Sequence, residues 1–95
     1  MIELFFRNME STEYARQIVL ERMSEMLDKA PRLANHKFKV ELERIDSGFG
    51  PEPDYFKINV QVKGMLVRQL QLSSKHPSLY RALADICDEL SQKVK

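Results

Sequence analysis

Apolar and polar residues alternate along four segments of the chain. Residues 2–7, 37–43 and 56–63 each place their apolar side chains on a single parity, with Phe5 as the exception, and the pattern returns over residues 66–72. A period of two puts successive side chains on opposite faces of a β-strand. Four strands with one apolar face each are therefore predicted. Arg68 falls on the apolar parity of the last segment, which predicts a strand end or a bulge there.

Two other segments have the helical period of 3.6 residues. The first is predicted to run from Glu13 to about Asp28, with Ser11 or Thr12 as its N-terminal cap. Pro77 suits the first turn of the second helix, with His76 or Ser78 as the cap. The mainly apolar face of the first helix contains Ala15, Ile18, Val19, Arg22, Met23 and Met26, and the apolar stripe of the second contains Leu79, Leu83, Ile86, Cys87, Leu90 and Val94.

The element order β-α-β-β-β-α follows from these segments. Residues 29–36 form a connection, residues 47–53 contain two glycines and two prolines typical of a loop, and Gly64-Met65 suits a turn. A helical crossover allows the first two strands to be parallel, and short links make the last three an antiparallel meander. The predicted fold class is α+β, a two-layer sandwich in which both helices cover one face of a four-stranded mixed sheet.

Composition narrows the class of protein. The 95 residues suit one domain, residues 1–95, and 43% hydrophobic with 31% charged residues is typical of a globular protein. The sequence contains no apolar run of membrane-spanning length, and no basic residues precede its apolar start as they do in a secretion signal. We therefore expect a cytoplasmic protein without membrane contact. Its single cysteine excludes an internal disulfide and a multi-cysteine metal site.

Candidate catalytic and metal-ligating residues are few. Cys87 lies within an apolar helical stripe, which favours a buried structural thiol. His36 and His76 fall in predicted connections without ligand spacing, so a solvated or capping role is expected for each. The sequence has no phosphate-binding glycine loop, HExxH or CxxC motif. We therefore predict a non-enzymatic binding protein with no catalytic residue, metal, cofactor or small-molecule substrate.

The positive residues are more informative than the net charge of +1. On the predicted open face of the sheet, Lys37, Lys39, Lys57 and Lys63 alternate with Asn59, Gln61, Gln69 and Gln71. Such a face suits contact with a phosphate backbone, and it equally suits a solvated surface kept soluble by lysine. Phe5 and Tyr55 share the outward parity and suit either base stacking or partial cover by neighbouring side chains.

Two motifs resemble those of the ribosome hibernation-promoting factors and ribosome-associated inhibitors. Residues 7–19 are similar to the family pattern N-x-E-x-T-x-x-[AL]-R-x-x-[VI], with matches at Asn8, Glu10, Thr12, Arg16 and Val19. Residues 78–90 are similar to D-[ML]-Y-x-A-I-D-x-x-x-D-K-L, with matches at Leu79, Tyr80, Ala82, Asp88 and Leu90. The family fold is β-α-β-β-β-α, so the resemblance covers essentially the whole chain and is to the short form of the family.

The resemblance implies a protein that occupies the decoding channel of the small ribosomal subunit in starved or stationary cells. Inhibition of translation would be steric, with ribosomal RNA contacted by basic side chains, and the free protein would be a monomer or a weak dimer. The RNA-binding residues expected on this basis are Arg16, Arg22, Lys37, Lys39, Lys57, Lys63, Lys75, Arg81, Lys93 and Lys95.

Departures from the family pattern support a second hypothesis. Glu89 and Gln92 stand where family members usually have lysine and arginine, on the helix face used against RNA. Each lost phosphate contact weakens binding to RNA. A diverged protein-interaction module of the same fold, without affinity for ribosomal RNA, is therefore the alternative. A basic surface continuing onto the second helix would favour the ribosome, and interruption by Asp85, Asp88 and Glu89 would favour a protein partner.

Overall fold

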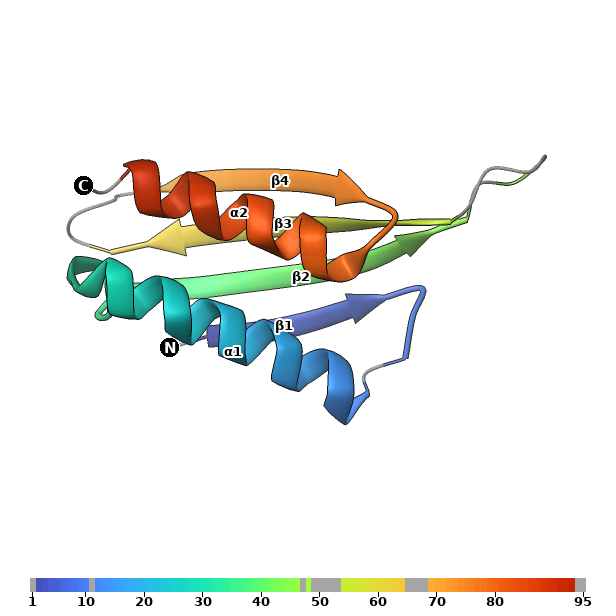
Figure 1. Cartoon of the computed structure of the whole chain (residues 1–95), viewed down its shortest axis with the longest axis horizontal. Helices are drawn as coiled ribbons and strands as arrows, with labels where there is room; N and C mark the ends of the chain where they lie inside the picture. Colours follow the sequence, from blue (N-terminus) through green and yellow to red (C-terminus); the bar gives the residue numbers. More distant parts are fainter. Residues whose placement is uncertain (1, 11, 47, 49–53, 65–68, 94–95) are drawn as a thin grey trace.

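The structure, a computed structural model, describes residues 2–10, 12–46, 48, 54–64 and 69–93. Its elements are β1 (Ile2–Arg7), α1 (Glu13–Lys29), a short 3-10 helix η1 (Pro31–Leu33), β2 (Lys37–Ile45), β3 (Tyr55–Lys63), β4 (Leu70–His76) and α2 (Leu79–Lys93). Both helices lie on one side of the sheet (Figure 1). The predicted α+β two-layer sandwich is confirmed.

The four strands lie in the order β1-β2-β3-β4. β1 pairs with β2 in parallel, with Ile2 opposite Phe38, and the other two pairings are antiparallel. This is the mixed sheet that the lengths of the connections predicted. The covered face holds the core, where Phe38, Val40 and Leu42 of β2 meet Ile58, Val60 and Val62 of β3 beneath both helices.

Local chemistry sets the two helix starts. The Oγ1 of Thr12 accepts a hydrogen bond from the backbone N–H of Ala15 at 3.1 Å, so Thr12 is the cap of α1, while Ser11 lies outside the described residues. The Oγ of Ser78 accepts from the N–H of Arg81 at 3.4 Å. The placement of Pro77 in the first turn was wrong, because α2 begins at Leu79 and the proline precedes the capping serine.

Asn8 also has a structural role. Its φ of 54° lies in the left-handed region, which asparagine tolerates better than most residues. Its Nδ2 donates a hydrogen bond of 2.7 Å to the backbone oxygen of Arg44. This bond links the turn after β1 to the C-terminal end of β2. Asn8 and Thr12, two of the residues that carry the family resemblance, therefore shape the entry into α1.

Two expectations for the connections need correction, and others fall on residues that the structure does not describe. η1 lies within the predicted connection 29–36, and its Leu33 is fully buried. β4 extends through Ser73, Ser74 and Lys75 to His76, beyond the predicted end near Leu72. The predicted loop 47–53 lies outside the described residues apart from Gly48, as do Met65 of the predicted turn, Arg68 and Val94.

His36 is not the solvated residue that its place in a connection suggested. It lies directly before β2 on the inward parity, and its side chain is buried with 4% exposure. The ring packs on Gly64, where an added Cβ would lie less than 3.0 Å from three ring atoms. His76 is the last residue of β4, and its Nδ1 accepts a hydrogen bond of 2.9 Å from the N–H of Ser78.

The contact between His36 and Gly64 gives the first testable prediction. Gly64→Ala should lower the free energy of unfolding by about 1–3 kcal/mol, because the new methyl group overlaps a buried ring that has little room to move. Urea unfolding measures the loss. In a His36→Ala background the same substitution should cost much less, and an equal cost in both backgrounds would contradict the proposed contact.

Candidate nucleic-acid interface

The uncovered face of the sheet gathers five of the predicted RNA-binding lysines. Lys37 and Lys39 lie in β2, Lys57 and Lys63 in β3, and Lys75 in β4, all on the parity that points away from the helices. The hydrophobic alternation predicted this grouping for the first four. Lys75 joins them because β4 continues past its apolar residues. We call these five residues the lysine face.

The ammonium groups of the lysine face are not neutralised within the part of the chain that the structure describes. No carboxylate there lies within 4.0 Å of any of the five. Lys39 lies over the ring of Phe5 with its Nζ 5.1 Å from the centroid, and Lys75 lies 5.9 Å from the centroid of Tyr55. Phe5 and Tyr55 therefore each form a cation–π contact with a lysine on the outward face. Ammonium groups without ion pairs are suited to bind phosphates.

Carboxylates on the same face are fewer than the basic groups. Glu3 lies opposite Lys39, and Glu43 lies opposite Lys57 in the strand register. Glu41 is paired with Arg7, whose Nε lies 3.4 Å from Oε1 of the glutamate. Arg7 is a basic residue of this face that the sequence analysis did not select, although its parity in the first strand was available as a signal. The described part of the open face is therefore positively charged on balance.

The other predicted RNA-binding residues do not join the lysine face. Arg16 and Arg22 lie on α1, Arg81 and Lys93 lie on α2, and Lys95 lies outside the described residues. Arg22 is engaged within the protein, because its guanidinium stacks 3.9 Å from the ring centroid of Tyr80 and forms an ion pair of 3.1 Å with Glu25. Its side chain is only 26% exposed. The structure thus separates the nine described positions into a sheet group of five and a helix group of four.

The helix layer has a different charge from the lysine face. Asp85, Asp88 and Glu89 are all exposed on α2, where the described basic residues are Arg81 and Lys93. Gln92 is exposed as well. The interruption by acidic residues that was considered from the sequence is therefore present on α2. Any extended contact with an anionic partner has its best surface on the sheet.

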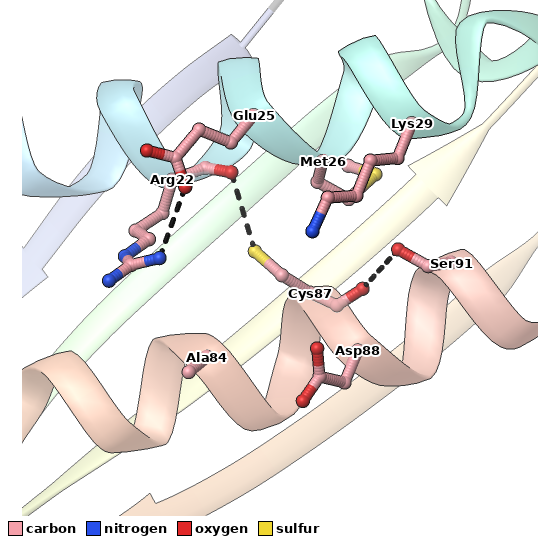
Figure 2. Close-up of a pocket in the computed structure, with 8 residues that line it drawn as sticks. All are labelled: Arg22, Glu25, Met26, Lys29, Ala84, Cys87, Asp88 and Ser91. Atoms are coloured by element: carbon pink, nitrogen blue, oxygen red, sulfur yellow. Dashed lines mark hydrogen bonds and ion pairs between the residues drawn. The ribbon is translucent and has the colours of Figure 1, made fainter.

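A small cavity lies between α1 and α2 (Figure 2). It encloses about 60 Å³, which is room for one or two water molecules rather than a metabolite. Cys87 faces it, and its thiol donates a hydrogen bond of 3.7 Å to the backbone oxygen of Arg22. Burial raises the pKa of the Cys87 thiol from 9.0 to about 11, and the nearby charge of Arg22 opposes this only in part. A neutral buried thiol is a poor nucleophile, in agreement with the expected structural role.

The described residues contain no group of three or more His, Cys, Asp or Glu side chains placed to hold a metal ion. None of the helices in the described ranges has the length and apolar character needed to cross a membrane.

Comparison with known proteins gives a clear result for the fold. No protein-family model and no curated protein matches the sequence. Among solved structures, the N-terminal domain of Thermus thermophilus Protein Y is similar with a TM-score of 0.67 and 20% identity, over 97% of this chain and 91% of that domain. A ribosomal subunit interface protein from Coxiella burnetii has a TM-score of 0.70 and 8% identity, over 98% of this chain and 91% of the other. The chain shares its fold with both.

The buried thiol gives a prediction of pH dependence. Because the pKa of Cys87 is raised on folding, its contribution to stability is complete below pH 9 and is lost as the pH rises towards 11. The free energy of unfolding of the wild type should therefore fall relative to that of Cys87→Ala, by about 1.4 kcal/mol for each pH unit of that interval. Urea unfolding of both proteins across the interval measures the difference. Parallel losses in the two proteins would mean that the thiol is not buried.

Proposed function

We propose that this protein is a ribosome-associated translation inhibitor that binds the small ribosomal subunit through its lysine face. Two independent observations support the ribosome as the partner. The chain resembles the hibernation-factor family in two motifs, and it shares its fold with Protein Y and with a ribosomal subunit interface protein. The binding position that we propose is the decoding channel, where the domain would exclude messenger and transfer RNA.

The lysine face is the observation that carries this proposal. Five lysines without ion pairs stand on one side of a rigid sheet, where each can replace counterions at a phosphate. The release of those counterions supplies affinity that decreases steeply as salt is added. Backbone contacts of this kind fix the orientation of a protein on RNA without requiring a particular base sequence. A steric inhibitor needs no more than such a surface and the volume of the domain behind it.

This proposal has three further parts. The protein acts in the cytoplasm, during stationary phase or stress, and it acts without enzymatic chemistry. The only described cysteine is buried and has a raised pKa, and the cavity beside it is too small for a substrate. Binding alone would account for inhibition, because the domain and a transfer RNA cannot occupy the same space.

A second candidate function rests on the helix layer. The exposed Asp85, Asp88 and Glu89 give α2 an acidic surface that would repel an RNA backbone. A protein-interaction module of the same fold would use this surface against a basic protein partner. The two candidates thus assign the contact to opposite sides of the molecule, and charge reversals on each side separate them.

Co-sedimentation with purified small subunits over a series of salt concentrations tests the proposal. The wild type should saturate near one copy per subunit and dissociate steeply as salt increases. Lys37→Glu/Lys39→Glu should weaken binding about tenfold or more and reduce the salt slope by about two, because two phosphate contacts are lost. Its circular dichroism should remain native, since both side chains are exposed.

The matched control is Lys29→Glu/Arg32→Glu, which reverses two exposed charges outside the lysine face. Its binding should stay close to that of the wild type. Equal weakening by both double variants would indicate attraction through net charge alone. Native folding with unchanged binding for Lys37→Glu/Lys39→Glu would exclude the sheet as the contact and would favour the acidic helix layer.

A further inference from the structure

The strand register places four members of the lysine face in two directly opposed pairs. Lys37 of β2 lies opposite Lys63 of β3, and Lys57 of β3 lies opposite Lys75 of β4. Like charges directly opposite each other on neighbouring strands destabilise a sheet. No described carboxylate lies close enough to any of the four to form an ion pair. A bound anion would relieve the repulsion within each pair.

The two pairs lie near opposite ends of the same face. Lys57 and Lys63 are six residues apart along β3, which at about 3.3 Å per residue is about 20 Å. Between the pairs lies a band of uncharged hydrogen-bonding side chains that are aligned across two strands: Asn59 opposite Ser73, and Gln61 opposite Gln71. Lys39 borders this band beside the first pair, and Glu41 enters it with its charge paired to Arg7.

This layout is poorly suited to a single strand of RNA. Proteins that bind single strands combine a continuous basic track with aromatic side chains on which bases stack. Here the part of the middle that lies on β3 and β4 is uncharged amide and hydroxyl, and the charged side chains beside it on β2 are Lys39 and the Glu41 that is paired with Arg7. The outward Phe5 has Lys39 over its ring, and Tyr55 lies at one end of the face beside Lys75. Phe5 lies level with the band but on β1, two strands away from β3, so neither ring belongs to the band itself.

The layout does fit the minor groove of an A-form RNA duplex. That groove is wide and shallow, its two edges are phosphate backbones, and its floor presents 2′-hydroxyl groups. Each lysine pair would contact one backbone. The amides of Asn59, Gln61 and Gln71, which both donate and accept hydrogen bonds, would face the hydroxyl groups between them.

We propose that the lysine face binds double-stranded RNA across its minor groove, with one lysine pair on each strand and the amide band on the 2′-hydroxyl groups. This inference rests on the proposed function and deepens it, because it specifies a helical segment of ribosomal RNA as the element contacted. Recognition would depend on the shape and sugar of the duplex rather than on base sequence.

Fluorescence anisotropy with labelled oligonucleotides tests the proposal. The probes are a short RNA duplex, one of its strands alone, and the DNA duplex of the same sequence, each titrated at several salt concentrations. The wild type should bind the RNA duplex about tenfold more tightly than either of the others. Equal or tighter binding to the single strand, or binding to none of the three, would overturn the inference.

Paired substitutions assign the contacts. Lys37→Gln/Lys63→Gln and Lys57→Gln/Lys75→Gln should each weaken duplex binding and reduce the salt slope by about two, whereas Lys29→Gln/Arg32→Gln should change neither. Gln61→Ala/Gln71→Ala should keep the salt slope and lose the preference for RNA over DNA. Loss of binding from only one lysine pair would contradict contact with two strands.

Two measurements keep the outcomes distinct. Each lysine-pair variant should unfold at the same or a slightly higher urea concentration than the wild type, because removing a pair relieves repulsion. Weakened binding therefore cannot be attributed to unfolding. Co-sedimentation with the small subunit tests the proposed function separately. Co-sedimentation without duplex preference overturns this inference alone, and duplex preference without co-sedimentation overturns the ribosomal role alone.

Discussion

Burial of the sheet on one side only is the constraint on which the rest of the structure depends. Val40 and Leu42 of β2 and Ile58 and Val60 of β3 have no exposed surface, and each such side chain contributes about 1.5–3 kcal/mol relative to an exposed position. A slip of one residue in the strand pairing would turn these side chains to water and bring lysines into the core. The core therefore fixes the register, and the register fixes the outward face.

As a result, the side chains on the two sides of the molecule have different roles. The helix side is stabilised by internal contacts such as the stacking of Arg22 on Tyr80 and the burial of Cys87. No described helix covers the other side of the sheet (Figure 1), and the ammonium groups and amides of the strands lie on that side. The departures from the family pattern at Glu89 and Gln92 lie on α2. They change the charge of the helix layer and leave the lysine face as it is.

Several features could not be predicted from the pattern because they lack a local signal. The last residues of β4 are polar, and they become a strand only because β3 offers backbone hydrogen bonds along their whole length. Leu33 stands alone in a short turn, and tertiary packing buries it. His36 continues the inward parity of β2, so the alternation in the sequence could have predicted its burial. Its partner Gly64, however, is 28 positions away and is identified only by the pairing of β2 with β3.

The sequence by itself determined the elements, the layered fold and the membership of most of the lysine face, because periods of two and 3.6 residues state which side chains share a surface. It could not determine how basic residues on different strands are aligned. That alignment is a property of pairing between distant segments, and it decided that Lys37 faces Lys63 and that Lys57 faces Lys75. Tertiary structure also decided that Arg22 turns towards Tyr80, since two helices must pack side by side before a guanidinium from one can cover a ring from the other.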